Sequence, residues 1–231
     1  MIQISISEEI IKACPDLQIV ALSCQLKNTQ SDDNLWKQIA LIKERIRAEL
    51  QIEEINKWPP IFATRQAYKR LGKDPNRYRP SSEALCRRIL RGLPLYQIDT
   101  LVDIVNLVSI QSGFSIGGFD LDKIEGNQLV LGVGHEGEIY RGIGRGELNI
   151  EGLPVYRDKK GGVGTPTSDE ERTKIDIDTT HFLMIINGYS GKDGLLEAAQ
   201  YSIELLEKYV SAKDIEVELI VSEGKTILSF S

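Results

Sequence analysis

The alternation of apolar and polar side chains predicts β-strands near both ends of the chain. Residues 2–6 alternate between isoleucine and a polar side chain, which is typical of a half-buried strand. The run LQIVALSCQ at 17–25 is predominantly aliphatic and predicts a strand in the middle of a sheet. Apolar segments at 215–221 and 226–230, separated by a Ser-Glu-Gly turn, predict a closing hairpin.

Helices are predicted where apolar side chains recur every three or four residues. This spacing indicates amphipathic helices at 34–50 and 193–210, and a short helix is expected directly after the first strand. The segment 99–112 is far more apolar and predicts a buried helix at the centre of the domain. Its polar exception, Asn106, must bond to a neighbouring backbone group or line a pocket, and both alternatives stay open.

After Gly113 the chain takes on β character, with glycines at short intervals and a turn expected at Gly117-Gly118. Strands are expected near 128–133, 138–141, 154–157 and 181–188. The whole pattern predicts an α+β fold in a single domain, residues 1–231. Helices and a small sheet would lie at the N-terminal side, a β-sandwich-like layer would follow Gly113, and a helix and hairpin would close the fold.

Positive charge is concentrated in one stretch. Residues 65–91 hold nine basic and two acidic side chains, a local charge of +7 in a protein of formal net charge −6. The other 204 residues therefore carry −13. A basic segment on an acidic body is typical of an anion-binding face, because the rest of the protein would repel a polyanion. The alternative is the solvated face of a helix.

The middle of this stretch favours a rigid turn. Gly72 ends one predicted helix, two prolines restrict the connection, and a Ser-Ser-Glu run caps the next helix. The turn presents Arg77, Tyr78 and Arg79, which suit phosphates or carboxylates and offer a stacking face. The connection is too long and too proline-rich for a DNA-reading helix-turn-helix, so DNA is not an expected partner.

Cysteine usage and hydropathy exclude several classes of protein. Cys14, Cys24 and Cys86 are odd in number and far apart, so neither a disulfide framework nor a metal site is expected, and no cofactor is indicated. A reduced, cytoplasmic location follows. The N-terminus lacks the basic and apolar regions of a signal peptide. No apolar run approaches about 18 residues, so no membrane span is expected.

Two glycine-rich runs fail as nucleotide-binding loops. Gly142-x-Gly144-x-Gly146 does not open a predicted helix, as a dinucleotide-binding loop would. The run 161–169 lacks the Gly-Lys-Ser/Thr ending of a loop that cradles phosphates. Neither a dehydrogenase nor a nucleotide triphosphatase is therefore expected.

No catalytic triad is recognisable. The chain has two histidines: His135 lies in a predicted turn, and His181 begins a strand, where it would face a pocket mouth or merely cap the strand. The loop 165–169 packs hydroxyl groups and a carboxylate between glycine and proline. It would present backbone N–H groups to an oxyanion, or it is a structural turn. The catalytic candidates are Thr165, Thr167, Ser168, Asp169 and His181.

Three runs of residues together resemble a known family. They are RQAYKRLGKDPNRYRPSSEALCRR at 65–88, LVDIVNL at 101–107 and FDLDKIEG at 119–126. They are similar to the editing module of the phenylalanyl-tRNA synthetase beta subunit, the fused third and fourth domains, and more closely to free-standing bacterial proteins that consist of that module. The resemblance covers 58–189. Residues 1–57 would be an N-terminal extension, and 190–231 a C-terminal helix and hairpin in the same fold.

The resemblance implies an aminoacyl-tRNA deacylase, a hydrolase that cleaves the ester of a mischarged tRNA without a triad. A pocket for the amino acid would be lined by Asn106, Gly117, Gly118, Thr180, His181 and Ile185. Binding of tRNA would use Arg65, Tyr68, Lys69, Arg77, Tyr78, Arg79, Arg87 and Arg88.

The chain departs from the family pattern at two places. Gly117 stands where bacterial synthetase modules have a histidine, and the strand at 182–186 carries no acid to read a tyrosine hydroxyl. We therefore expect that tyrosine is not the amino acid edited. Two alternatives stay open beside the hydrolase: a non-catalytic binder of tRNA or of a small amino-acid-like anion, and a small-molecule protein whose arginines form a structural ion-pair network.

Overall fold

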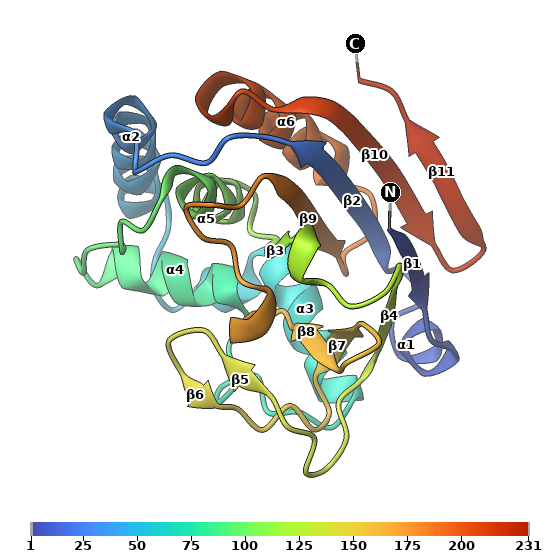
Figure 1. The fold of residues 1–231 in the computed structure, drawn as a ribbon. Helices are drawn as coiled ribbons and strands as arrows, with labels where there is room; N and C mark the ends of the chain where they lie inside the picture. Colours follow the sequence, from blue (N-terminus) through green and yellow to red (C-terminus); the bar gives the residue numbers. More distant parts are fainter. Residues whose placement is uncertain (1, 231) are drawn as a thin grey trace.

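The computed structural model describes residues 2–230 and arranges them in three layers (Figure 1). A layer of helices covers one face of a five-stranded sheet, and a four-stranded sheet packs on its other face. This arrangement confirms the mixed α+β fold, with helices packed on a sandwich-like β layer.

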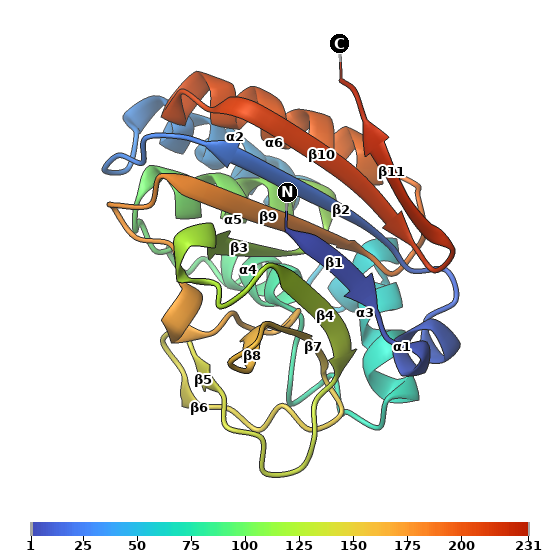
Figure 2. The ribbon, with the colours of Figure 1, turned by 45° about the vertical axis from the view of Figure 1, so that its right-hand side comes forward.

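The five-stranded sheet is antiparallel throughout and takes its strands from both ends and the middle of the chain. Its order is β11 (Gly224–Leu228), β10 (Lys213–Val221), β2 (Gln18–Gln25), β9 (His181–Gly188) and β3 (Ser115–Asp120). The central position predicted for the strand at 17–25 is therefore confirmed, and β3 and β11 form the two edges (Figure 2).

The aliphatic sequence of β2 follows from burial on both faces. Val20 and Leu22 pack into the cluster formed with the helices, whereas Ile19 and Ala21 pack against the second sheet. Because successive strand residues point to opposite faces, a strand between two packed layers needs apolar side chains at every position.

The second sheet has the order β1 (Gln3–Ile6), β4 (Gln128–Val133), β7 (Pro154–Arg157) and β8 (Gly162–Gly164). The N-terminal strands therefore do not form a small sheet of their own, because β1 pairs with β4 and β2 joins the larger sheet. The strand predicted at 138–141 is also wrong. Extended pairing begins only at the short hairpin of β5 (Arg141–Gly142) and β6 (Gly146–Glu147).

The helices lie close to their predicted positions. They are α1 (Glu8–Ala13), α2 (Asp33–Glu49), α3 (Pro59–Arg70), α4 (Ser81–Leu90), α5 (Thr100–Ser112) and α6 (Leu195–Val210), with short 3₁₀ turns at Ile55–Lys57, Leu121–Lys123 and Glu171–Thr173. Helices α5 and α6 pack on the five-stranded sheet, and α2 and α4 pack against α5, which confirms α5 as the buried central helix. Within residues 2–230, no helix is long and apolar enough to cross a membrane.

Local chemistry explains where α5 begins and ends. The side chain of Asp99 accepts a hydrogen bond from the backbone N–H of Val102 and so caps the first turn. Gly113 adopts φ +81° at the C-cap, a left-handed conformation that favours glycine. The turn expected at Gly117-Gly118 is wrong, because both glycines lie inside the edge strand β3.

Candidate functional site

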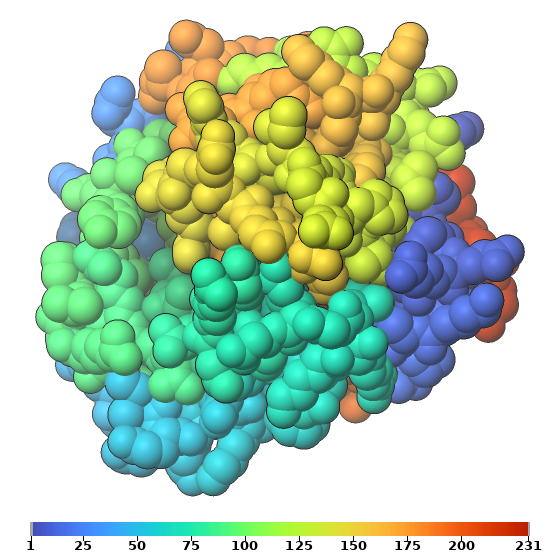
Figure 3. Space-filling view, turned by 90° about the horizontal axis from the view of Figure 1, so that it is seen from below, coloured from blue at the N-terminus to red at the C-terminus, as the bar shows by residue number. Residues whose placement is uncertain are grey.

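A cavity of about 510 Å³ opens between α4, α5, the edge strand β3 and the segment 174–177. Its walls are mainly aliphatic: Leu85, Val102, Val105, Ile116 and Ile175 line it. Figure 3 shows a hollow on this side of the molecule, between the green segment that precedes α5 and the yellow segment around β6. A concave, mostly apolar space with a few polar groups is the usual form of a small-molecule site.

Missing side chains at two glycines leave room for the Asp169 carboxylate and for the cavity wall. A Cβ atom on Gly164 would lie 2.8 Å from Asp169 Oδ1 and 2.5 Å from the Phe119 ring. On β3, a Cβ atom on Gly118 would lie 2.8 Å from the Cδ1 atom of Ile175. All three distances are too short for a real contact, so the carboxylate and the cavity wall keep their places only because these residues are glycines.

Asp169 is the ionisable group with the most perturbed environment in the cavity. Its Oδ2 atom accepts a hydrogen bond of 3.1 Å from the backbone N–H of Gly118, and it forms no ion pair with any residue from 2 to 230. Burial raises the pKa of Asp169 to about 7, and the Gly118 hydrogen bond opposes this only in part. A carboxylate with such a pKa is a candidate general base near neutral pH.

Asn106 lines the same cavity from the exposed side of the otherwise buried helix α5. Its side-chain amide has no hydrogen-bond partner among the described residues. The sequence left two alternatives for Asn106, a bond to a neighbouring backbone group and a place in a pocket lining. The geometry corresponds to the second. The amide is free to donate to, or accept from, a group in the cavity.

The charges around the cavity are predominantly negative. Asp99, Asp169 and Asp176 line it, and Lys174 is its only lining residue with a positive charge. Asp99 also caps α5, and Asp176 forms an ion pair with Lys123. The site therefore favours a ligand that carries a positive charge over an anion.

The hydroxyl groups of the loop 165–168 already have hydrogen-bond partners, in the loop and on α3. Thr165 Oγ1 accepts hydrogen bonds from the backbone N–H groups of Thr167 (3.2 Å) and Ser168 (3.1 Å). Thr167 Oγ1 lies 2.8 Å from the Tyr68 hydroxyl. The loop is therefore a structural turn, and the oxyanion-binding interpretation is wrong. Of the residues predicted in this loop, only Asp169 lines the cavity.

Four residues predicted to line the pocket lie elsewhere. Gly117 and Ile185 are register partners whose side-chain directions face the second sheet, because alternation along a strand places them opposite to the helices. Thr180 is exposed, outside the cavity lining. His181 is also exposed, and its Nδ1 atom lies 2.8 Å from a carboxylate oxygen of Asp122. A catalytic role for His181 in this cavity is therefore excluded by position.

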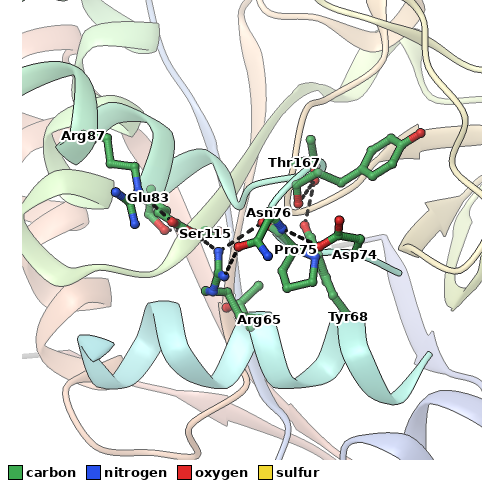
Figure 4. A network of polar contacts seen from close by, with 12 residues as sticks. Arg65, Tyr68, Asp74, Pro75, Asn76, Glu83, Arg87, Ser115 and Thr167 are labelled. Carbon is green, nitrogen blue, oxygen red and sulfur yellow. Dashed lines mark hydrogen bonds and ion pairs between the residues drawn. The ribbon is translucent and has the colours of Figure 1, made fainter. Parts of the chain in front are cut away.

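Part of the basic stretch is structural (Figure 4). Arg65 is 7% exposed and donates to Glu83 (2.8 Å), to the Pro75 carbonyl (3.0 Å) and to Asn76 (2.7 Å). Arg87 donates to the other oxygen of the fully buried Glu83 at 2.8 Å. A buried carboxylate needs such partners, and so these arginines are not available to phosphates as the sequence predicted.

Tyr68 is likewise a core residue. Its side chain is fully buried, and its hydroxyl is bonded to Thr167, so the prediction that it contacts RNA is wrong. Arg88 is half-buried: it donates to the Pro94 carbonyl, and its guanidinium lies 4.3 Å from the centroid of the Tyr96 ring.

The remaining predicted RNA contacts lie on the surface. Lys69, Arg77 and Arg79 are exposed, and the half-buried Tyr78 ring lies 3.8 Å from Lys73 Nζ and 5.6 Å from the Arg77 guanidinium carbon. These side chains surround the turn between α3 and α4.

The turn that carries these basic residues contacts the loop that carries Asp169. The backbone N–H of Ser81 donates to the Pro166 carbonyl at 2.7 Å, and Ser81 also lines the cavity. The distance between Thr167 Oγ1 and the Tyr78 carbonyl is 3.5 Å. The fold therefore places the exposed basic turn beside the segment that leads into the cavity.

The groups at the cavity mouth were not predicted from the sequence. Ile98, Ile143 and Ile177 are exposed and line the cavity, and Arg141 and Arg145 flank Ile143 in the β5–β6 hairpin. A signal was present in the sequence, because each of these isoleucines lies among glycine, polar or charged neighbours. The three isoleucines belong to three separate segments, however, and only the fold brings them to one opening.

Other reactive side chains do not form a second reaction centre. The three cysteines are buried free thiols, and burial raises the pKa of Cys14 to about 11 and that of Cys86 to about 12. A thiol with such a pKa is a poor nucleophile at neutral pH. In the part of the chain from 2 to 230, no group of three or more His, Cys, Asp or Glu side chains is placed to hold a metal ion.

The three-layer fold with this cavity is found in a known family of domains. The B3/4 domain family matches residues 63–221, well over half of the chain, and the chain belongs to that family. An N-terminal fragment of the phenylalanyl-tRNA synthetase beta subunit from Pyrococcus horikoshii has a similar fold, with a TM-score of 0.52 and 14% sequence identity.

That similarity covers 99% of this chain and 54% of the synthetase fragment, so the chain spans about half of the fragment's length. The resemblance to the beta-subunit module inferred from the sequence is thereby confirmed. No sequence among curated proteins matches the chain. At such low identity, the structural similarity establishes the fold alone.

Proposed function

We propose that the protein hydrolyses the ester bond of a mischarged aminoacyl-tRNA, with the amino acid held in the cavity. The observation that carries this proposal is the set of charged groups on the cavity wall, three carboxylates and one ammonium group; Asp176 is already paired with Lys123 and Lys174 with Glu171, which leaves the carboxylates of Asp99 and Asp169 without a cationic partner. An aminoacyl ester bears an ammonium group and no carboxylate, so its charge complements this wall. A free amino acid or another small anion would place a carboxylate among like charges, which disfavours the alternative of an anion binder.

In this mechanism the ionised Asp169 takes a proton from a water molecule, and the resulting hydroxide attacks the ester carbonyl carbon. The carbonyl oxygen gains negative charge, and the free amide of Asn106 donates a hydrogen bond to it. The bond from the carbonyl carbon to the ribose oxygen then breaks. That oxygen takes the proton back from Asp169, which leaves the free amino acid and the deacylated tRNA.

The aliphatic wall supports an apolar amino acid as the one removed. The β9 residues that face the helices, Phe182, Met184 and Ile186, are apolar, fully buried and outside the cavity lining, so this strand offers no partner for a phenolic hydroxyl. A buried hydroxyl without a partner is costly, and for this reason tyrosine is not the expected substrate. The exposed Lys69, Arg77 and Arg79 would contact tRNA phosphates beside the cavity.

The test is the deacylation of a panel of correctly and incorrectly charged aminoacyl-tRNAs. We expect hydrolysis of one mischarged species, a loss of about 10²–10⁴-fold in kcat for Asp169→Asn, and a raised KM for Arg77→Ala/Arg79→Ala. A control variant, Lys208→Gln/Lys213→Gln, removes two exposed charges on α6 and β10 and should behave as wild type.

The pH dependence gives an independent check of the role of Asp169. Because the base must be ionised and burial raises its pKa to about 7, kcat/KM should rise as the pH increases through about 7. If every ester survives an excess of the wild-type protein, the protein is not a deacylase, and the two alternatives that remain are a non-catalytic binder and a small-molecule protein.

A further inference from the structure

A second cavity, of about 650 Å³, lies between the C-terminal end of α5 and the N-terminal ends of α3 and α6. Its lining shares no residue with that of the cavity that contains Asp169. A space of this size can hold a small organic molecule, and the proposed hydrolysis makes no use of it. We name it the aromatic cavity, after the rings of Trp58, Phe114 and Tyr201 in its lining.

The three aromatic rings come from three different segments. Trp58 is the N-cap of α3, Phe114 follows the C-cap of α5, and Tyr201 lies on α6. Phe114 is buried, whereas Trp58 and Tyr201 are half-buried and keep part of their ring surface accessible. A Cβ atom on Gly113 would lie 3.2 Å from the Trp58 indole, so this ring packs closely against the end of α5. The face of such a ring attracts a cation, most strongly where water is excluded.

Three polar groups of the lining lack a partner. Within residues 2–230, the Trp58 indole N–H and the Tyr201 hydroxyl make no hydrogen bond, and the Ser190 hydroxyl oxygen is buried without one. The other tryptophan differs in this respect, because the Trp36 indole N–H donates to the Asp103 carboxylate at 2.6 Å. Free N–H and O–H groups beside aromatic rings suit a ligand that carries an oxygen acceptor.

The two charged side chains of the lining are both acidic. Asp193 directly precedes the N-cap of α6, and Glu197 lies in the first turn of that helix. Both are exposed, and neither forms an ion pair or a hydrogen bond through its carboxylate with any residue from 2 to 230. Acidic groups at this position also complement the helix dipole. That structural role does not account for the aromatic rings and the free donors in the same lining.

Basic side chains near the aromatic cavity lie outside its lining. Arg45 donates to the side chain of Gln111, which lines the cavity, at 2.9 Å. Lys57 lies 4.0 Å from a carboxylate oxygen of Glu54, and Lys192 is exposed in the loop before α6. None of them is paired with the two carboxylates of the lining, so a cation that enters the cavity meets two free negative charges.

Aromatic faces next to free carboxylates are the chemistry that recognises an organic cation. We propose that the aromatic cavity binds a small organic cation with an alkylated ammonium group and an oxygen acceptor. The ammonium group lies against the rings of Trp58 and Tyr201 and near the carboxylates of Asp193 and Glu197, and the ligand oxygen accepts from the Trp58 indole N–H. The same carboxylates disfavour a ligand with a carboxylate or phosphate of its own. This inference does not rest on the proposed function.

The test is a titration of the wild-type protein with choline, followed by calorimetry and NMR spectroscopy. The matched control compound is neohexanol, in which a carbon atom replaces the ammonium nitrogen, so that the shape is kept and the charge is lost. We expect choline to bind about tenfold more tightly than neohexanol. The indole N–H signal of Trp58 should shift, whereas that of Trp36, which lies outside the lining, should not.

Variants test the two kinds of recognition separately. Asp193→Asn/Glu197→Gln changes exposed side chains and should weaken choline binding about tenfold. The control Glu8→Gln/Glu9→Gln removes two exposed acidic groups from the first turn of α1 and should bind choline as the wild type does. Tyr201→Leu should also weaken binding about tenfold, whereas Tyr201→Phe, which keeps the ring, should stay within about threefold of the wild type.

Several results would overturn the organic-cation site. They are the absence of choline binding at millimolar concentrations, equal affinities for choline and neohexanol, and an affinity that is unchanged without the two carboxylates. A dimer in sedimentation that buries the Trp58 indole would instead assign this surface to a second copy of the chain. If choline binds as expected but no aminoacyl ester is hydrolysed, the proposed function fails and the organic-cation site stands.

Discussion

At the scale of single residues, burial disfavours the ionised form of Asp169. Burial raises its pKa to about 7, above the ordinary value of 3.8. The folded state binds the Asp169 proton more tightly than the unfolded state does. Ionisation of Asp169 therefore lowers the stability of the folded state as the pH rises from about 4 through 7. A carboxylate that is kept at such a cost is typical of functional sites.

Asp169→Asn should therefore stabilise the protein at high pH. The amide oxygen can still accept the hydrogen bond from the Gly118 N–H, and the variant carries no charge to bury. We expect its Tm to exceed that of the wild type at pH 8, with a difference that vanishes by about pH 4, where both side chains are neutral. Thermal unfolding across this pH range measures it. A Tm below that of the wild type at pH 8 would contradict the assigned pKa.

Residue types alone could not separate the functional from the structural members of a motif. Arg65 and Arg79 both looked like phosphate ligands in the sequence, yet Arg65 pairs with the buried Glu83 and Arg79 is exposed. In the same way Thr165 and Asp169 belong to one polar loop, and only Asp169 reaches the cavity. The direction of each side chain depends on partners far away in sequence.

At the scale of elements, α5 is the scaffold of the site. Its apolar residues fix it between the sheet and the helices α2, α4 and α6, and Asn106 is thereby held at the cavity wall. Its C-terminal cap, Gly113, lies against Trp58: a Cβ atom there would be 3.2 Å from the indole ring. The end of α5 is therefore specified both by backbone conformation and by packing.

Gly113→Ala should destabilise the protein more than the same change at another helix end. At Gly72, φ is +84° but nothing lies within 4 Å of an added Cβ, so Gly72→Ala should cost only the left-handed backbone penalty of about 1–2 kcal/mol. Gly113→Ala adds displacement of the Trp58 ring to that cost. Urea unfolding of the two variants gives the difference, and equal costs would show that the ring moves freely.

Element types were largely predictable, but the short hairpin was not. The helices and the longer strands have clear periodicity, so their positions followed from the sequence. Strands β5 and β6 have two residues each and no core face, so no pattern of burial marks them. The two glycines of β3 predict a turn because glycine is rare in strands; here the close approach of Asp169 to Gly117 and of α5 to Gly118 requires them.

At the scale of the whole molecule, the exposed basic turn lies on an acidic protein. The formal net charge is −6, so attraction to RNA must come from a local face, and it should be sensitive to salt. Lys69, Arg77 and Arg79 provide such a face. Arg65 and Arg87 do not contribute freely to it, because Glu83 neutralises part of their charge.

The salt dependence of tRNA binding should therefore depend on the exposed Arg77 and Arg79 and not on the buried pairs of Arg65 and Arg87 with Glu83. Each phosphate neutralised contributes about 0.7–0.9 to the slope of log K against log salt, so Arg77→Gln/Arg79→Gln should reduce the slope by about 1.4–1.8. Filter binding or fluorescence anisotropy at several salt concentrations measures it. An unchanged slope would place the RNA elsewhere, and Lys208→Gln/Lys213→Gln serves as the control.

The sequence by itself determined the class of fold, most of its elements and the family, because these depend on periodicity and on contiguous motifs such as 65–88. Only the tertiary structure decided which polar residues share a cavity. Asp169, Asn106 and Ile143 come from a loop, a helix and a hairpin, and they line one cavity beside the edge strand β3, where the absence of a side chain at Gly118 leaves room for Ile175 and Val105. Such convergence depends on long-range packing, which a linear pattern does not encode locally.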